Sequence, residues 1–380
     1  MNFVDTYIKP VGKFLFQRYY CNKFFRESRI RSRQGQLIKT NYNRAAEKII
    51  VFLVPGADRY TGKDIISGGV LSIASLYNET VNCKAEHRAE VLMCTFPGEP
   101  LLLQHTNFAN NIVVYSFSQV SRYFVSLQNL VLHIPEYLAV HFEGRLNKEQ
   151  KSFLNKIPVF HINILNQNIH LMPSRPVIQS LEQLATKVTV TTAHKKYCNQ
   201  EWRRAFNVPL HHFSTFASPE RYSYVNYADK ENILLFSPDD AEKNAHVGKL
   251  LEEKIPGLKT RVINGLTYEE YKKLIGRAKW CITFGEGLDF YFIEPVFSGS
   301  VSFAIYNDKF FTTSFKELKT VYSSYESLAE KIAETIIELD SKDVYTRYNK
   351  MEFDLCADQY SYTRYQQNIS AFYQGHYTYP

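Results

Sequence analysis

WCITFGEGLDFYFIEPVFSGSVSFAI, residues 280–305, is the stretch that decides the fold. It opens with a strand-like run at Trp280–Thr283 and passes through a Gly-rich turn into a helix that begins near Asp289. A second apolar run, Ser300–Ile305, closes it. Strand, turn, helix and strand in this order are typical of a parallel β-sheet whose strands are joined by helices. The stretch therefore predicts an α/β domain.

The same alternation extends in both directions from this stretch. Further strands of this part are expected at Asn232–Phe236 and Lys259–Ile263, with helices at Glu242–Lys254, Tyr268–Arg277 and Tyr325–Leu339. Earlier in the chain, KIIVFLVP at Lys48–Pro55 is a near-continuous apolar run, as in a strand buried on both faces. It begins a separate series of expected strands: Glu90–Thr95, Asn111–Tyr115, Leu130–Ile134, Val159–Ile164 and Lys187–Thr191. The helices expected in that series are Val70–Tyr77, Val177–Leu184 and His194–Phe206.

Two such series predict two domains, since 380 residues exceed what one ordinary core holds. We expect an N-terminal Rossmann-like domain over residues 47–215 and a C-terminal one over 230–340. Residues 341–380 are expected to be helical. Residues 1–46 form a separate basic, aromatic segment.

The charge of the chain is concentrated at its beginning. The net charge is +7, and residues 1–46 hold ten Lys or Arg against only Asp5 and Glu27. The rest is about neutral, which argues against a nucleic-acid partner. The segment either binds an anionic membrane surface or forms helices that pack on the protein with a solvated basic face.

The remaining composition narrows the class of protein further. The six cysteines are scattered, with no C-x-x-C and no zinc spacing, which indicates reduced thiols and no metal site. No apolar run reaches the roughly 18 residues of a membrane span. Phe14–Phe16 are followed at once by Arg18, unlike a signal peptide. We therefore expect a cytoplasmic protein, with residues 1–46 as the segment that would hold it at the inner face of the cell membrane.

Two glutamates in the fold-deciding stretch, Glu286 and Glu294, are separated by seven residues. The first follows a predicted strand and the second lies in the helix. This layout resembles the E-x7-E element of GT-B glycosyltransferases, in particular glycosyltransferase family four and related enzymes of bacterial polysaccharide assembly. The resemblance implies that Glu286 contacts the donor sugar and Glu294 the nucleotide ribose. It also implies that the turn around Glu286, with Gly285, Gly287, Leu288 and Asp289, faces the diphosphate at a helix N-terminus.

Two other loops resemble donor-binding elements of that family. Gly68 and Gly69 precede a predicted helix and allow close approach of a phosphate to the backbone. Ser237 ends the first strand of the second series, and Lys243 matches a lysine that holds the diphosphate. The arginine that the family pairs with this lysine is missing, and Pro238, Asp239 and Asp240 stand in its place.

Polar residues also follow or end later strands of the first series. These are His133, Glu136, His161, Asn163 and Asn166. Their neutral hydrogen-bonding groups suit a polyol. We expect His133, Asn163 and Asn166 to contact the acceptor. For each His, an ordinary role in the core or on the surface is as open as a role in binding.

The resemblance implies a GT-B fold of two Rossmann-like domains with parallel sheets facing across a cleft, and a C-terminal helix that crosses back to the N-domain. It implies a glycosyltransferase, hexosyltransferase-like, that transfers a sugar from a nucleotide-sugar to a glycan or lipid-linked glycan. Such a role fits O-antigen or capsule synthesis. We expect no cofactor, no metal and a retaining outcome. If the enzyme inverts, Glu136, His161 or Glu286 is the candidate base.

Two alternatives stay open at this point. One is a glycan- or nucleotide-binding protein without activity on a degenerate GT-B fold, which the missing arginine favours. The other is an enzyme of Rossmann type that modifies sugar nucleotides. The G-x-G-x-x-G fingerprint that it would need after the first strand is absent, since VPGADRYTG does not match.

Overall fold

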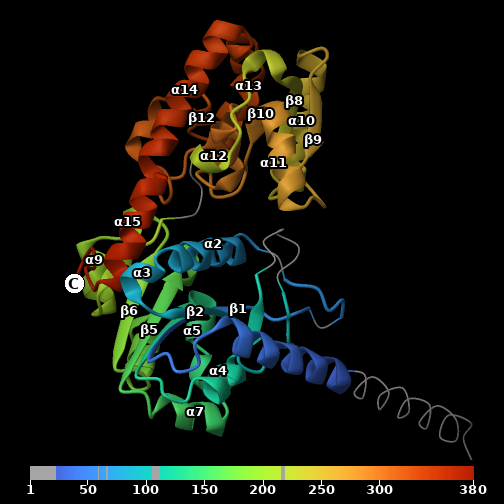
Figure 1. Ribbon diagram of the computed structural model, residues 1–380. Helices are drawn as coiled ribbons and strands as arrows, with labels where there is room; N and C mark the ends of the chain where they lie inside the picture. The colour runs from blue at the N-terminus through green and yellow to red at the C-terminus, as the bar shows by residue number, and fades with distance from the viewer. Residues whose placement is uncertain (1–22, 59, 66, 105–111, 215–218) are drawn as a thin grey trace, which may run out of the picture. The chain divides into compact units, whose positions relative to one another are not determined.

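The computed structural model describes residues 23–58, 60–65, 67–104, 112–214 and 219–380. The chain divides into two compact units, each built around one sheet (Figure 1). The first unit holds the described residues up to Val190 with Phe206–Val208, and the second holds Thr191–Ala205 and Pro209–Pro380. Residues 1–22, nearly half of the expected basic segment 1–46, lie outside the described residues, and so does the start of the expected strand at Asn111–Tyr115.

The first sheet has seven strands in the order β3-β2-β1-β4-β5-β6-β7. Its strands are β1 (Lys48–Val54), β2 (Glu90–Thr95), β3 (Val114–Ser116), β4 (Asn129–Pro135), β5 (Val159–Asn166), β6 (Lys187–Thr192) and β7 (Leu210–His212). β1 pairs in parallel with β2 on one side and with β4 on the other. Its residues Ile49–Val54 are fully buried, as the apolar run predicts for a central parallel strand.

Helices connect these strands along the first unit. They are α2 (Gly68–Asn82), α3 (Lys84–His87), α4 (Phe117–Tyr123), α5 (Glu136–Ala139), α6 (Phe142–Arg145), α7 (Lys148–Leu154) and α8 (Arg175–Glu182). The chain proceeds from β1 outward to β2 and β3, then returns to the other side of β1 with β4. The direction of winding therefore reverses between β1 and β4, and ligands of such sheets bind at the carboxyl ends of the strands beside that reversal.

The second sheet has five strands in the order β12-β11-β10-β8-β9. The strands are β8 (Glu231–Phe236), β9 (Lys259–Val262), β10 (Ala278–Ile282), β11 (Val301–Ile305) and β12 (Val321–Tyr322). The helices are α9 (Gln200–Phe206), α10 (Ala241–Lys254), α11 (Tyr268–Arg277), α12 (Phe290–Phe297), α13 (Tyr325–Leu339), α14 (Lys342–Gln359) and α15 (Tyr362–Tyr373). Here the winding reverses between β8 and β10, which pair in parallel.

Several helices differ from the sequence prediction for local reasons. The helix expected at His194–Phe206 is divided into a 3-10 turn, Lys195–Tyr197, and α9. Asn199 Oδ1 accepts a hydrogen bond from Trp202 N at 3.0 Å, and such a side chain favours a new helix start. The C-terminal helical stretch is likewise two helices, with Ser361 at the N-cap of α15.

The C-terminal end of the chain packs on β7, a strand that the sequence analysis did not predict. His211 Nε2 and the Asn368 carbonyl of α15 are 2.8 Å apart, and Tyr379 pairs with Leu210 in an isolated bridge. β7 and α15 belong to the same compact unit.

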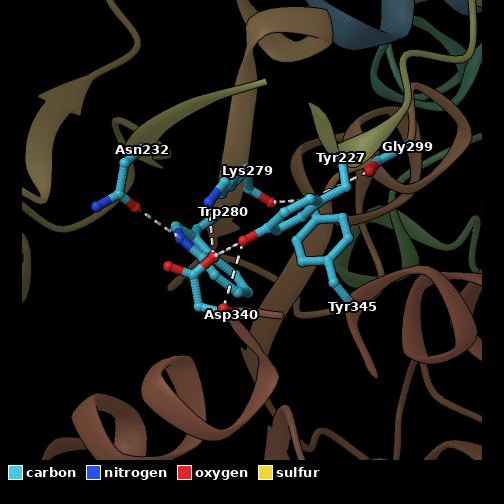
Figure 2. A network of polar contacts seen from close by, with 7 residues as sticks. All are labelled: Tyr227, Asn232, Lys279, Trp280, Gly299, Asp340 and Tyr345. Carbon is cyan, nitrogen blue, oxygen red and sulfur yellow. Dashed lines mark hydrogen bonds and ion pairs between the residues drawn. The ribbon is translucent and has the colours of Figure 1, made fainter. Parts of the chain in front are cut away.

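A polar network fixes the segment before β8 to the second sheet (Figure 2). Lys279 Nζ lies 2.6 Å from Asp340 Oδ1 and 4.2 Å from the ring centre of Tyr227. The Tyr227 hydroxyl donates to the same Asp340 oxygen at 3.0 Å. Tyr345 of α14 donates to the backbone carbonyls of Lys279 and Gly299, at 2.6 and 3.1 Å. These bonds tie α14 and the connecting segment to the ends of two strands.

A buried carboxylate attaches the same helix to the sheet further along. Glu352 is fully buried and accepts hydrogen bonds from Ser302 N at 3.0 Å and from Thr320 Oγ1 at 2.7 Å. Burial raises the pKa of Glu352 to about 8. In the folded chain, this side chain therefore holds a proton at pH values where the unfolded chain has released it.

We predict that Glu352→Gln flattens the pH dependence of stability. Because the pKa of Glu352 is raised on folding, its contribution is complete below about pH 4.5 and is lost as the pH rises through about 8. Between pH 5 and pH 8, the free energy of unfolding of the variant should rise by at least about 1 kcal/mol relative to that of the wild type, as measured by urea titration. Asp354→Asn, an exposed carboxylate on the same helix, is the control. An unchanged difference between variant and wild type across this range would contradict the assignment.

Candidate functional site

The carboxyl ends of β8 and β10 are joined directly at the reversal of the second sheet. Ser237 N donates to the Ile282 carbonyl at 2.9 Å, and Phe284 N donates to Ser237 Oγ at 3.4 Å. Ser237 is fully buried. The loop after β8 and the loop that carries Glu286 therefore start side by side, at the position where open α/β sheets bind ligands.

Three carboxylates gather around Gly285 in this place. A Cβ atom at Gly285 would lie 2.9 Å from Asp239 Oδ2 and 3.0 Å from Asp289 Oδ2, so a larger residue would require these carboxylates to shift. Glu286 is partly buried, and both burial and the charge of Asp239 raise its pKa. The structure thus brings Glu286 and Asp289 together, and it adds Asp239, which the sequence analysis did not assign.

Asp289 caps α12, so its carboxylate occupies the helix N-terminus. Asp289 Oδ1 accepts from Phe292 N at 3.1 Å, and Oδ2 accepts from Thr283 Oγ1 at 2.7 Å. Burial, followed by the charge of Asp239, raises the pKa of Asp289 to about 7. The sequence analysis expected this end of the helix to face a diphosphate, whereas here the chain supplies its own anion. A diphosphate at this position competes with Asp289 near neutral pH.

Lys243 stands beside this loop on the first turn of α10. Its Nζ is 2.9 Å from Asp240 Oδ2, and it lies 5.9 and 5.6 Å from the ring centres of Phe284 and Tyr325. Its charge is therefore shared with Asp240, in a partly exposed pair that contributes little to stability. An anion bound beside Phe284 would therefore lie near the Lys243 ammonium group.

Two pockets open at this edge of the second sheet. One, of about 360 Å³, is lined by the ends of β10 and β11: Thr283, Phe284, Gly285, Ile305, Tyr306, Asn307 and Asp308. The other, of about 510 Å³, lies between α10 and β9 and includes the basic residues Lys249 and Arg261. Glu286 is among the lining residues of neither pocket. The residues after β11 escaped sequence reasoning because no motif marks them.

Gly287 and Leu288 complete the turn as structural residues. Gly287 has φ +93°, and a Cβ there would lie 2.5 Å from the Phe311 ring and 2.9 Å from the Ile305 carbonyl. Only glycine is suited to both conditions. Leu288 is buried.

Glu294 is buried against tyrosine partners. It is 2% exposed, and its Oε1 accepts from Tyr222 at 2.6 Å and from Tyr268 at 2.8 Å. Tyr271 also lies against it, and burial raises the pKa of Glu294. Both hydroxyls come from distant segments, so the spacing of the two glutamates gave no sign of them. A ribose hydroxyl that binds Glu294 Oε1 would therefore have to displace a tyrosine hydroxyl.

Three of the residues expected in the first unit form a buried ladder across the sheet. Asn163 Nδ2 lies 3.0 Å from His133 Nδ1, and Thr189 Oγ1 donates to Asn163 Oδ1 at 2.7 Å. His161 Nε2 lies 2.8 Å from Thr189 Oγ1. Burial lowers the pKa of His161 to about 3, and it lowers that of His133 well below its usual range. Both rings are neutral and hold β4, β5 and β6 together, so we assign His133, His161 and Asn163 to the core rather than to a ligand.

Glu136 and Asn166 do lie at the carboxyl edge of the first sheet. Glu136 begins α5 directly after β4, and its carboxylate accepts from Gln167 N at 3.3 Å and Asn168 N at 3.2 Å. Burial raises its pKa to about 7. Asn166 Oδ1 and Gln167 Nε2 are buried without a hydrogen-bond partner among the residues that the structure describes. Unsatisfied amide groups of this kind suit the hydroxyls of a sugar.

The glycine pair reaches the same edge from α2. Gly68 and Gly69 are the first residues of α2, and Ser67 caps it by accepting from Val70 N at 3.2 Å. A Cβ at Gly69 would lie 2.9 Å from Gln167 Oε1, whereas Gly68 has open space around it. The start of α2 and the end of β5 therefore adjoin Glu136, which places four expected site residues together.

Neither a protein family model nor a curated protein matches the chain. Solved structures do match it. Sucrose-phosphate synthase from Thermosynechococcus elongatus is 10% identical, with 86% of this chain and 98% of that chain covered and a TM-score of 0.55. Anabaena Alr3699/HepE in complex with UDP-glucose is 11% identical, with 86% and 99% covered and a TM-score of 0.51.

These similarities, with the two parallel sheets, show that the chain has the GT-B fold of glycosyltransferases, as predicted. The E-x7-E element and the relationship to family four stay predictions. Within the described residues, no three metal-binding side chains are grouped closely enough to hold an ion. Among the helices that the structure describes, none has the length and apolar character that crossing a bilayer requires.

We predict that Asp289→Asn strengthens the binding of a nucleoside diphosphate. Asn also caps helices well, so the fold is retained while a negative charge beside the ligand is removed. With a pKa of about 7, Asp289 is mostly neutral at pH 6 and mostly charged at pH 8. The affinity of the wild type for a UDP-sugar should fall several-fold over this range, and that of the variant should change less, by calorimetry. Identical pH profiles would show that Asp289 does not face the ligand.

Proposed function

We propose that the chain is a glycosyltransferase that moves a sugar from a nucleotide-sugar donor to a glycan or lipid-linked glycan. The observation that carries the proposal is the position of the loop with Glu286 at the strand reversal of the second sheet. In this loop Phe284 N donates to Ser237 Oγ, the Phe284 ring lies 5.9 Å from Lys243 Nζ, and Phe284 and Gly285 line a pocket at the ends of β10 and β11. The fold adds support, since HepE was solved with UDP-glucose. UDP-sugars are therefore the first donors to test.

Each side chain at the edge of the second sheet has a defined task in this proposal. Glu286 accepts hydrogen bonds from hydroxyls of the donor sugar, and its charge strengthens them. Lys243 attracts the diphosphate and stabilises the charge that develops as the leaving group departs. Because Lys243 can supply this charge, we propose a reaction that needs no metal and is unchanged by EDTA.

The polar edge of the first sheet is the proposed acceptor site. The amides of Asn166 and Gln167 bind acceptor hydroxyls, and Glu136 lies beside them with a pKa of about 7. A retaining reaction needs no strong base. If the product is inverted, Glu136 is the best placed base, since a group with this pKa accepts a proton near neutral pH.

The proposed setting is bacterial surface polysaccharide synthesis, such as O-antigen or capsule, on the inner face of the cell membrane. Its support is the basic, aromatic beginning of the chain, which suits a lipid-linked acceptor.

A second candidate function is nucleotide or glycan binding without catalysis. The acidic surroundings favour it, because Asp239 and Asp240 stand where a diphosphate-binding arginine was expected, and Asp289 lies beside the same glycine, Gly285, as Asp239. Thermal shift separates the candidates, together with turnover. A binder is stabilised by a nucleoside diphosphate or a glycan yet releases no nucleotide.

The test of the proposal is turnover of a panel of UDP-, GDP- and dTDP-sugars, measured as release of nucleoside diphosphate. We expect at least one donor to be consumed, and Glu286→Ala to lower kcat/KM by about 100-fold or more, an effect of about 2.7 kcal/mol. Glu330→Ala, an exposed glutamate on α13, is the matched control. Full activity of Glu286→Ala would remove this residue from the site, and turnover of no donor would favour the binding function.

A further inference from the structure

The N-terminal helix, residues 23–41, is fixed to the first unit through its second half. Gln34 is fully buried, and its amide binds the edge strand β3: Nε2 donates to the Val114 carbonyl at 3.0 Å, and Oε1 accepts from Ser116 N at 3.2 Å. Gln119 Nε2 donates to the Arg31 carbonyl at 3.0 Å. The first turns of the helix, by contrast, are largely exposed.

Aromatic side chains are exposed on these first turns and on the loop after β1. Phe24 and Phe25 are 70% and 63% exposed, and their rings meet edge to face at 6.1 Å. Tyr60 is 97% exposed and Ile65 40%. Arg26 Nη2 donates to the Gly62 carbonyl at 3.0 Å, which ties this loop to the helix. We call residues 23–33, together with Tyr60 and Ile65, the basic aromatic patch.

The charge of the patch is strongly positive. Residues 23–33 contain five basic residues, Lys23, Arg26, Arg29, Arg31 and Arg33, and one acidic residue, Glu27, which gives a net +4. Arg31 pairs with Glu27 at 3.3 Å. Exposed rings set among cations are unlike the centre of an ordinary protein interface, which is depleted of charge. They match the interface of an anionic bilayer, where rings enter the headgroup region and cations meet phosphates.

We propose that the basic aromatic patch docks the chain on an anionic phospholipid bilayer. Each basic residue near such a surface contributes about 1 kcal/mol, and the aromatic rings add apolar burial. The loop with Tyr60 follows β1, so the patch adjoins the carboxyl edge of the first sheet. Docking would bring the proposed acceptor site close to lipid-borne substrates. Only this last consequence rests on the proposed transferase function, because docking itself requires no turnover.

The test is flotation of the full chain with vesicles of phosphatidylcholine alone or of phosphatidylcholine and phosphatidylglycerol at 3:1. We expect binding to the anionic vesicles only, and release in 0.5 M NaCl. Arg29→Gln with Arg33→Gln should lower the partition coefficient about tenfold or more, since two cations are lost. Phe24→Ser with Phe25→Ser should lower it about tenfold even at low salt.

Matched variants control for charge and for apolar surface elsewhere. Lys309→Gln with Lys342→Gln removes the same charge from the second unit, and Val125→Ser with Val140→Ser removes exposed apolar groups from the first. Both should bind as the wild type does. The proposal is overturned if the wild type does not float with anionic vesicles, or if control and patch variants lose binding equally. A dimer abolished by Phe24→Ser with Phe25→Ser, without vesicle binding, would assign the patch to a second copy.

Discussion

The reversal of strand order around one central strand in each sheet is the constraint on which the candidate sites depend. In the first sheet the chain leaves β1 on one side and returns on the other with β4, and in the second sheet β8 and β10 have the same relation. The loops at the reversal diverge, since their helices go to opposite faces. This divergence leaves the carboxyl ends of the two strands open for polar side chains. Both candidate clusters, around Glu136 and around Glu286, follow from it.

The chemistry at the two reversals differs. At the first, an uncharged set of amides surrounds Glu136, as suits a polyol that carries no charge. At the second, Glu286, Asp239 and Asp289 gather around Gly285, and Lys243 on the neighbouring loop is paired with Asp240. If this edge binds an anionic donor, as proposed, protonation of Asp289 or movement of Lys243 would reduce the repulsion between like charges.

Much of the architecture was predictable because its signals are local. Buried parallel strands appear as apolar runs, and the helices Tyr268–Arg277 and Tyr325–Leu339 have the bounds that their patterns predict. β7 was missed because only three residues, Leu210–His212, form it, and its partners come from distant segments. The alternation of His161 and Asn163 showed that they share one face of a strand. It did not show that Thr189 of the neighbouring strand would form hydrogen bonds with both side chains.

The site was predictable only where its residues belong to one loop. Glu286, Gly285 and Asp289 are close in sequence and close in the structure. The tyrosines around Glu294 come from positions 222 and 268, so neither spacing nor propensity could reveal them. The position of Asp289 was compatible with both donor binding and helix capping, because an Asp before an apolar helix is also the ordinary N-cap. The structure shows the cap.

The central claim is that the carboxyl edge of the second sheet binds the nucleotide-sugar. Hydrogen–deuterium exchange of the full chain, with and without saturating UDP, tests it most directly. The account predicts slower exchange in peptides covering residues 237–244 and 283–292. Unchanged exchange in both peptides, with protection elsewhere in the chain, would contradict it.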